Sequence, residues 1–542
     1  MPVIEIQKDD LLRLVGKDMN NDEIEEVMFL LKSEVAFSGN TMECEINPDR
    51  PDMFSVEGIA RAIRSFTGVE TGLRKYRMEK PAIKMTVEPV EARPSIACAV
   101  IKDVKLDDSL VKSLMQLQEK LHDGLGRKRA KVAVGVHDFD RMRTPIIYKQ
   151  SDPKDTFFIP LNESREMSLE KTVEKTEKGR EYANLLRSYE FWPVIMDDMG
   201  IMSFPPILNS DRTKVTENTR SLFIDVTGTD KKAVEFVLNI IICNITERGG
   251  RIFPVKSGEN EYPNLEPREM KLEVKDIDSL LGLGLSENDI KQCLERMGYE
   301  VVKMRGGFID ILIPAYRADI MHAVDIIEDV AMGYGFNNIE PALPKIPTLG
   351  GYSERERMIE KMRLAMIGLG FQEFMGFILT NSSNNFRKMH IEEGEHAEIL
   401  NPVSSDYAIC RTWLLPSLMK VLSGNKHYDY PQTIFEVGDA ILVDESAETG
   451  AKNIKKLAVV VAHDRANLTE MKSYLESFLG MFDVDYQIEP AVHSSFITGR
   501  VGKIIIDGKH AGFFGEIRPE VLDSWKMDKP VIAFELDLER LM

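Results

Sequence analysis

The spacing of apolar residues changes along the chain between the periods of helices and strands, which predicts a mixed α+β protein. Leu222, Ile224 and Val226 alternate with polar positions, so we expect a strand that ends in a turn at Gly228. The spacing that follows Ser353 instead predicts an amphipathic helix. The purely apolar stretches, such as 457–462, are far shorter than the roughly 20 residues of a membrane-spanning helix, so no membrane partner is expected.

Two regions of the chain repeat one pattern of apolar, glycine and turn positions. Gly16 pairs with Gly282 and Ile24 with Ile290 at a single constant offset. After a one-residue insertion, the segment that begins at Arg50 pairs with the one that begins at Arg317. In each copy polar residues precede an amphipathic helix, as N-capping requires. We therefore expect one small helical, winged unit that the chain uses twice.

Proline, glycine and charge replace periodic apolar residues in three stretches, 74–84, 254–269 and 341–351, which we interpret as connections. The length of 542 residues is also too great for a single core. The sequence thus predicts a multidomain protein of four units, at 1–80, 85–253, 268–342 and 350–542.

Composition restricts the possible functions. The net charge is −19, from 69 Lys and Arg against 88 Asp and Glu, so the chain as a whole repels phosphate and a purely electrostatic nucleic-acid binder is disfavoured. The five cysteines show no CxxC spacing, which argues against a zinc site or a disulfide framework. The N-terminal residues lack the pattern of a secretory signal, so we expect a cytoplasmic protein.

Acidic residues gather in the second copy of the repeat. At spacings of three and four residues they share one helix face, and a further carboxylate precedes the helix. Such clustering is unfavourable unless a cation, water or a basic partner compensates, and Mg²⁺ favours carboxylates and waters. The alternative is a solvated acidic helix face. In the first copy, Ala60 and Arg61 replace two of the acids. The candidate Mg²⁺ ligands are Asp319, Asp325, Glu328 and Asp329.

The segments AYRADIMHAVDIIEDVAMGYG (315–335) and EINPDRPDMFSVEGIARAI (45–63) resemble phenylalanyl-tRNA synthetase beta subunits of the archaeal and eukaryotic type, in the class II family. The resemblance implies Mg²⁺ at an interface with an alpha subunit, in an alpha₂beta₂ heterotetramer. It further implies a ligase of protein biosynthesis that attaches phenylalanine to tRNA(Phe), with ATP and phenylalanine bound by the alpha subunit.

The segments 118–140, 203–215 and 221–230 resemble the editing domain of that family, which hydrolyses mischarged tyrosyl-tRNA. The expected editing residues lie on a strand end and in a turn, where they could also serve only as caps. A basic cluster that could contact tRNA phosphates, or form a solvated turn, lies within the segment 118–140. The editing candidates are Asn209, Ser210, Asp225, Thr227 and, more weakly, His137, and the tRNA candidates are Arg127, Lys128, Arg129 and Lys131.

The fourth unit resembles the class II synthetase fold, an antiparallel sheet with flanking helices, but lacks its active-site motifs. The strand IFEVGDAI (434–441) has Glu436 without the arginine of an FRxE motif, and Arg411 is expected to be structural. No residue of this chain is therefore expected to catalyse the synthetic reaction. Two other readings remain open, a stand-alone metal-dependent phosphodiesterase and a scaffold that binds nucleic acid.

Overall fold

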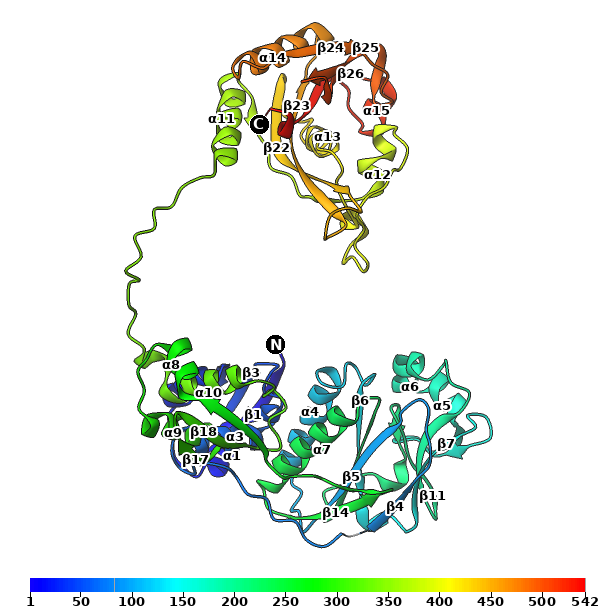
Figure 1. The fold of residues 1–542 in the computed structure, drawn as a ribbon. Helices are drawn as coiled ribbons and strands as arrows, with labels where there is room; N and C mark the ends of the chain where they lie inside the picture. The colour runs from blue at the N-terminus through cyan, green and yellow to red at the C-terminus, as the bar shows by residue number, and fades with distance from the viewer. Residues whose placement is uncertain (82, 542) are drawn as a thin grey trace. The chain divides into compact units, whose positions relative to one another are not determined.

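A computed structural model of the chain describes residues 1–81 and 83–541. Ala82, in the predicted connection 74–84, and Met542, in the predicted fourth unit, lie outside the described residues. The chain divides into an N-terminal body, Met1–Leu343, and a C-terminal body, Pro344–Met542 (Figure 1). Within the described ranges, no helix combines the length and apolar character that crossing a membrane requires.

The chain begins with a small sheet and three helices. Asn20 and Glu23 form a capping box at the start of the second helix, as the polar residues before it predict. The first helix ends at Gly16, whose φ of 74° is readily adopted by a residue without Cβ. The sheet has the order β1-β3-β2. The elements are β1 (Val3–Gln7), α1 (Lys8–Val15), α2 (Asn21–Leu30), β2 (Ser33–Ser38), β3 (Thr41–Ile46) and α3 (Val56–Phe66).

The last part of the N-terminal body has the same order of helices and strands as its first part. Its first helix ends at Gly282, with a φ of 65°, and Ser286 forms a capping box with Asp289 at the second. Its sheet order, β16-β18-β17, matches that of the first sheet position by position. The elements are β16 (Arg268–Glu273), α8 (Val274–Leu281), α9 (Glu287–Arg296), β17 (Glu300–Arg305), β18 (Phe308–Ile313) and α10 (Ala323–Tyr334).

Between these parts lies a mixed ten-stranded sheet, with the order β12-β11-β10-β7-β4-β14-β5-β13-β6 and β15 paired to β14. Strand β13 is buried along its whole length between β5 and β6. The strands are β4 (Ile83–Val87), β5 (Ser95–Lys102), β6 (Val132–Asp138), β7 (Ile146–Ser151), β10 (Trp192–Asp197), β11 (Gly200–Phe204), β12 (Leu208–Asn209), β13 (Leu222–Gly228), β14 (Arg251–Ser257) and β15 (Asn260–Tyr262). The helices are α4 (Asp108–Asp123), α5 (Leu169–Lys175), α6 (Glu177–Tyr182) and α7 (Lys231–Thr246), and β8 (Phe157–Phe158) pairs with β9 (Met167–Ser168).

The prediction that 254–269 is a connection is wrong, because most of this stretch lies in strands β14, β15 and β16. Pro254 is tolerated in β14 because the strand pairs with β5 up to this residue and with β4 and β15 beyond it. The missing N–H therefore falls where the strand changes partners. Lys84, at the end of the predicted connection 74–84, likewise lies in β4.

One hydrophobic core connects the first, middle and last parts of the N-terminal body, and two smaller clusters lie within the middle part. The core joins Ile59 of α3 to Leu238 of α7 and to Leu294 of α9, all fully buried. The central helix α7 is apolar around most of its circumference, as expected of a helix packed on several sides. Parts that are distant in the sequence are therefore held together by direct packing.

The C-terminal body is built on a seven-stranded, mainly antiparallel sheet of order β19-β22-β23-β27-β26-β25-β24. Along β23, Leu457, Val459 and Val461 join the core under α11 and α14, while the alternate residues join the core under α13 and α15. As predicted, α11 begins after Ser353, whose side chain caps it. The helices are α11 (Glu354–Gly368), α12 (Ser382–Asn385), α13 (Leu415–Gly424), α14 (Leu468–Gly480) and α15 (Pro519–Ser524).

The strands of this sheet are β19 (Gln372–Glu373), β22 (Gln432–Val443), β23 (Ala451–Ala462), β24 (Tyr486–Pro490), β25 (Phe496–Ile506), β26 (Lys509–Ile517) and β27 (Val531–Asp537). A separate two-stranded ladder joins β20 (Leu379–Thr380) to β21 (Ile409–Cys410). The connection 341–351 forms neither helix nor strand, and Leu343 and Leu349 are almost fully exposed in it.

Candidate functional site

A large cavity of about 570 Å³ lies in the N-terminal body beside the ten-stranded sheet. Helix α4, strand β6 and the segment 203–215 line most of it. Its walls are mainly apolar, with a few polar side chains that converge from different elements. This size and composition are typical of a pocket for a small organic group.

The charged group on the floor of the cavity is the carboxylate of Asp225, which comes from the buried strand β13. Nε2 of His137 lies 2.8 Å from Oδ2 of Asp225, and Nδ1 of the same ring lies 2.8 Å from Oγ1 of Thr213. Asp225 and His137 are almost fully buried. The ring therefore fixes the position of the carboxylate from the side away from the cavity.

Gly135 allows the carboxylate to lie close to strand β6. A Cβ atom at this position would come within 2.1 Å of Oδ2 of Asp225 and 3.0 Å of Nε2 of His137. A side chain here would have to displace the carboxylate. The glycine thus belongs to the geometry of the cavity floor, although it carries no functional group.

An ion pair forms one wall of the cavity. Nη2 of Arg129 donates to Oε1 of Glu119 at 3.1 Å, and its Nη1 donates to the carbonyls of Pro206 and Ile207. The ring of His122, whose Nδ1 lies 3.6 Å from Oε1 of Glu119, and the charge of Arg129 lower the pKa of Glu119 to about 2. Burial lowers the pKa of His122 itself. Because its Nε2 accepts from the N–H of Val134 at 2.9 Å, the neutral ring carries its proton on Nδ1, toward Glu119.

Two of the predicted editing residues, Asn209 and Asp225, line this cavity. Nδ2 of Asn209 donates to the carbonyl of Val136 at 3.3 Å, and its Oδ1 accepts from Ser203 at 3.0 Å. These bonds fix the amide at the edge of the cavity. Sequence reasoning missed Glu119 and Gly135, since neither belongs to a pattern that indicates a pocket.

The expectation that Ser210 and Thr227 line the cavity is wrong. The hydroxyl of Ser210 donates to the carbonyl of Ile159, and the hydroxyl of Thr227 accepts from Nε of Arg93 at 3.0 Å. Both side chains are buried. Alternation predicted an open face for β13, but the strand has a neighbour on each edge and is covered on both faces.

The basic cluster is divided by the fold. Arg127, Lys128 and Arg129 have left-handed φ values of 49°, 52° and 65°, a conformation that costs L-residues free energy. This turn leaves Arg127 and Lys128 exposed but directs Arg129 into the cavity wall, where it is buried. Lys131 pairs with Asp230 at 3.0 Å. Only Arg127 and Lys128 therefore remain free to meet an approaching phosphate.

The four predicted metal ligands, Asp319, Asp325, Glu328 and Asp329, line a hollow of about 210 Å³ at the start of α10. Lys32 and Arg50 line the same hollow. These two cations come from the first part of the chain and lie far from α10 in the sequence. The fold therefore brings basic residues of the first part of the N-terminal body against acidic residues of its last part.

Each of the four carboxylates has a protein partner. Asp319 accepts from Nε and Nη2 of Arg317, the latter at 2.7 Å, and Nη2 also lies 2.7 Å from Oδ2 of Asp329. Asp325 accepts from the N–H groups of Met321 and His322, which caps the helix. Glu328 pairs with Nζ of Lys32 at 2.8 Å.

These residues do not fit a bound Mg²⁺. Within residues 1–81 and 83–541, no group of three or more His, Cys, Asp or Glu side chains is placed to hold a metal ion. Burial alone would lower the pKa of Lys32, but Glu328 and Asp49 outweigh it and raise the pKa. The prediction that four carboxylates share a metal is therefore corrected: Arg317 and Lys32 pair with three of them, and two backbone N–H groups hold Asp325.

We expect the thermal stability of the chain to be the same in chelator and in millimolar Mg²⁺, since Arg317 and Lys32 already pair with three of the four carboxylates. Thermal denaturation followed by circular dichroism measures this. Glu328→Gln serves as the comparison, because its carboxylate is exposed. A saturable rise in the melting temperature with Mg²⁺ that Glu328→Gln abolishes would show that the ion pairs give way to a metal.

In the C-terminal body, Arg411 and Glu436 pair with each other. Nη1 of Arg411 lies 2.7 Å from Oε1 of Glu436, and its Nε donates to the carbonyl of Asp439 at 2.9 Å. Both side chains are buried. Burial raises the pKa of Glu436, although Arg411 acts in the opposite direction. The arginine is thus committed to internal contacts, which agrees with the structural role predicted for it.

Comparison with known proteins identifies relatives over the full length. Residues 270–336 match the family described as "tRNA synthetase B5 domain", and residues 339–538 match "Phenylalanyl tRNA synthetase beta chain CLM domain". The phenylalanine–tRNA ligase beta subunit of Pyrococcus furiosus is 42% identical, covering 100% of both chains. That of Methanocaldococcus jannaschii is 41% identical, covering 99% of this chain and 100% of the relative.

A solved structure also matches the N-terminal body. An N-terminal fragment of the phenylalanyl-tRNA synthetase beta subunit from Pyrococcus horikoshii superposes with a TM-score of 0.59 at 38% identity. The match covers 62% of this chain and 100% of that fragment. Sequence and structure therefore point to the same family.

Proposed function

The chain belongs to the archaeal phenylalanine–tRNA ligase beta-subunit family, ligases of protein biosynthesis, and on that premise we propose that its N-terminal body hydrolyses mischarged tyrosyl-tRNA. The observation that carries the proposal is the cavity of about 570 Å³ with Asp225 on its floor. A pocket that accepts phenylalanine rejects tyrosine only about a hundredfold, since tyrosine merely adds a hydroxyl. A second, hydrolytic site restores accuracy.

The chemistry we assign to the cavity is hydrolysis of the aminoacyl ester. A water held by Asp225 attacks the ester carbonyl carbon, the bond to the ribose oxygen breaks, and the proton of the water passes to that oxygen. The products are free tyrosine and uncharged tRNA. Asn209, on the cavity edge, offers an amide for orienting the substrate, and His137 acts through Asp225 as a positioning residue.

The proposal is tested with the purified assembly of this chain and its alpha subunit. Release of labelled tyrosine from tyrosyl-tRNA(Phe) is compared with release of phenylalanine from phenylalanyl-tRNA(Phe). We expect the tyrosyl ester to be hydrolysed at least about tenfold faster. Equal rates for the two esters, or rates no higher than in buffer alone, would contradict an editing function.

For the synthetic reaction we propose that the chain acts as the partner of an alpha subunit in an alpha₂beta₂ heterotetramer. The alpha subunit binds ATP and phenylalanine, and tRNA(Phe) contacts both subunits. In this chain Arg127 and Lys128 are the contacts we propose for tRNA phosphates. The Mg²⁺ that accompanies ATP is assigned to the alpha subunit, because the acidic hollow does not fit it.

We propose three further features of organisation. The parts 1–80 and 268–342 are two copies of one unit, supported by their matching sheet orders and glycine-terminated helices. The part 85–253 is the editing domain. The part 350–542 is a class II synthetase-like domain without catalytic residues, supported by its antiparallel sheet with flanking helices. A cytoplasmic location fits a partner in protein synthesis.

The loops before and after β20 and β21 expose a group of large apolar side chains, to which we assign the alpha subunit. Met375, Phe377, Leu400 and Val403 are 87%, 76%, 99% and 108% exposed. Exposed apolar groups of this kind mark interaction surfaces. We expect Phe377→Asp combined with Val403→Asp to weaken association with the alpha subunit about a hundredfold, by analytical ultracentrifugation. Val492→Asp, equally exposed at 85%, is the control that should associate normally.

The alternative of a metal-dependent phosphodiesterase gains no support from the side-chain positions. Such an enzyme needs carboxylates free to bind a metal, whereas ion pairs and a helix cap occupy those of the acidic hollow. A scaffold that binds nucleic acid through the repeated units is also disfavoured by the charge of −19.

A further inference from the structure

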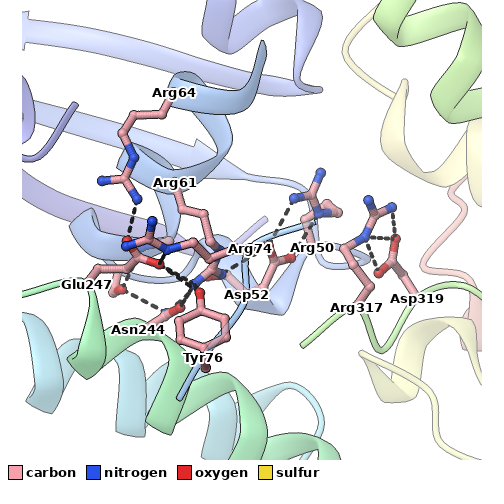
Figure 2. A network of polar contacts seen from close by, with 12 residues as sticks. Arg50, Asp52, Arg61, Arg64, Arg74, Tyr76, Asn244, Glu247, Arg317 and Asp319 are labelled. Carbon is pink, nitrogen blue, oxygen red and sulfur yellow. Dashed lines mark hydrogen bonds and ion pairs between the residues drawn. The ribbon is translucent and has the colours of Figure 1, made fainter. Parts of the chain in front are cut away.

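A second, much smaller cavity, of about 30 Å³, lies in the N-terminal body between its first part, residues 1–80, and its last part, residues 268–342. Helix α3, the segment 70–74, the end of α9 and Tyr316 contribute to its lining. Five of the lining side chains are arginines, and two are carboxylates, Asp52 and Glu70. Figure 2 shows part of this polar network, in which Arg61, Arg64 and Arg74 lie around the carboxylate of Glu247. The five arginines that line the cavity are Arg50, Arg61, Arg64, Arg74 and Arg296.

Positive charge exceeds negative charge at this cavity. Asp52 holds Arg50 through two bonds of 2.9 Å. Glu247 and Glu70 face Arg64 and Arg74. Among the described residues around the cavity, three carboxylates therefore oppose five guanidinium groups. Such a surplus is unusual in a chain with a net charge of −19.

Part of the surplus positive charge lies on the guanidinium group of Arg296. Its Nε donates to the carbonyl of Phe66 at 3.0 Å and its Nη1 to the carbonyl of Gly333 at 2.6 Å. Neither acceptor carries a net charge, so the guanidinium is hydrogen-bonded without being neutralised. It also stacks over the ring of Phe66 at 4.3 Å. A negative charge in the cavity would neutralise the guanidinium group of Arg296.

Arg61 provides the second observation. The side chain is 5% exposed, stacks on the ring of Tyr316 at 3.8 Å, and donates from Nη1 to Oδ1 of Asn244 at 2.9 Å. Its Nη2 is buried with no hydrogen-bond acceptor among the described residues, since Oδ2 of Asp52 lies 3.5 Å away without hydrogen-bond geometry. The Nε atoms of Arg64 and Arg74 are also buried without a hydrogen-bond acceptor among the described residues. Leaving a buried charged donor without an acceptor is costly.

We propose that this cavity binds one small oxyanion of the size of phosphate or sulfate. An anion here would accept from the unsatisfied N–H groups and balance the surplus charge, and guanidinium forks match the geometry of oxyanions. The volume holds about two water molecules, which excludes a nucleotide. Because α3 and α9 meet here, the bound anion stabilises the junction of the first and last parts.

The proposal is tested on the full-length chain by thermal denaturation at constant ionic strength in phosphate, sulfate and chloride. We expect a saturable rise of the melting temperature by a few degrees in phosphate and in sulfate but not in chloride. Equilibrium dialysis with labelled phosphate should show one ion per chain. A cavity that holds only water would give no saturable rise and no bound phosphate, which would overturn the proposal.

Variants locate the binding. Arg61→Gln should abolish the response, but its contacts with Tyr316 and Asn244 make it a risk for folding. Arg74→Gln is the second variant, because its side chain is 38% exposed and should leave the fold intact. We expect it to weaken phosphate binding about tenfold. Arg251→Gln is the matched control, an exposed arginine paired with Asp103 outside the cavity. Equal phosphate affinity in Arg74→Gln and Arg251→Gln would place any bound ion elsewhere and refute the assignment.

Discussion

In the assembly with the alpha subunit, Asp225→Asn is expected to slow hydrolysis of tyrosyl-tRNA about a hundredfold or more while phenylalanine is attached at the wild-type rate. The substitution removes the charge that holds the attacking water but keeps the size of the side chain. Oδ2 of Asp225 lies 2.8 Å from Nε2 of His137, so the asparagine can keep this contact. Single-turnover deacylation and steady-state aminoacylation, measured on one preparation, separate the two activities.

Asp138→Asn is the matched control for this experiment. Asp138 lies at the end of β6, is 5% exposed, and accepts from Oγ1 of Thr219 at 2.8 Å, but it does not line the cavity. Loss of the Asp138 charge should leave the rate of deacylation within about threefold of the wild-type rate. We expect it to change only the stability of the protein. If both variants lose the same fraction of activity, the cavity floor is structural and Asp225 has no direct role.

Gly135→Ala tests whether deacylation depends on the position of the Asp225 carboxylate, since it leaves the charge of that group unchanged. A Cβ atom 2.1 Å from Oδ2 of Asp225 forces the group to move while leaving its charge intact. A displacement of about 1 Å can cost on the order of a hundredfold in rate. We therefore expect Gly135→Ala to resemble Asp225→Asn in deacylation. Wild-type deacylation by Gly135→Ala would show that the position of the carboxylate is unimportant.

Local features of the fold could be predicted from the sequence because they depend on neighbouring residues. Polar residues before α2 and α9 identify helix starts, since an N-cap side chain binds backbone N–H groups only two or three residues away. The alternation of Leu222, Ile224 and Val226 identifies strand β13 for the same reason. These signals are contained within one turn or one strand.

The candidate sites were harder to predict because their contacts join distant segments. The acidic face of α10 was recognised, but its compensation by Lys32 depends on how two parts of the N-terminal body pack. A helix-face pattern cannot distinguish a metal from a lysine as the compensating cation. Likewise Arg129 belonged to a visible basic cluster, yet its direction depends on three consecutive left-handed residues. Asp225 could be predicted because it lies on a strand that alternation identifies. The residues that fix its position, His137 and Gly135, lie on another strand, β6.

The two parts with the same order of elements, 1–80 and 268–342, differ in the sign of the charge that lies beside their buried arginine–aspartate pair. In the first, Arg61 lies 3.5 Å from Asp52, and in the second Asp329 lies 2.7 Å from Arg317. Burial alone would raise the pKa of Asp52, but Arg50, Arg61 and Arg317 hold it at about 2. Each part thus has an arginine–aspartate pair and one further charge beside it, which is Arg61 in the first part and Asp329 in the last.

Arg317→Met is expected to destabilise the N-terminal body by about 3–5 kcal/mol, the largest stability effect among single substitutions in this network. Arg317 is 1% exposed, and Asp319 and Asp329 both depend on it. Asp329 is 3% exposed and otherwise accepts only the hydroxyl of Tyr299, at 2.5 Å, among the described residues. Removing the arginine therefore leaves a buried carboxylate without a compensating charge. Urea denaturation, with hydrogen exchange in α10 to locate the change, measures the effect.

A double substitution distinguishes loss of charge balance from loss of packing. Arg317→Met combined with Asp329→Asn removes the isolated charge, so it should recover at least about half of the lost stability. Arg251→Met, in an exposed pair with Asp103, is the control and should cost less than about 1 kcal/mol. If the double variant is as unstable as Arg317→Met, packing of the guanidinium against Tyr299, whose ring centre lies 5.5 Å away, outweighs the ion pairs. In that case the stability of the N-terminal body depends on the packing of Arg317 and not on its charge.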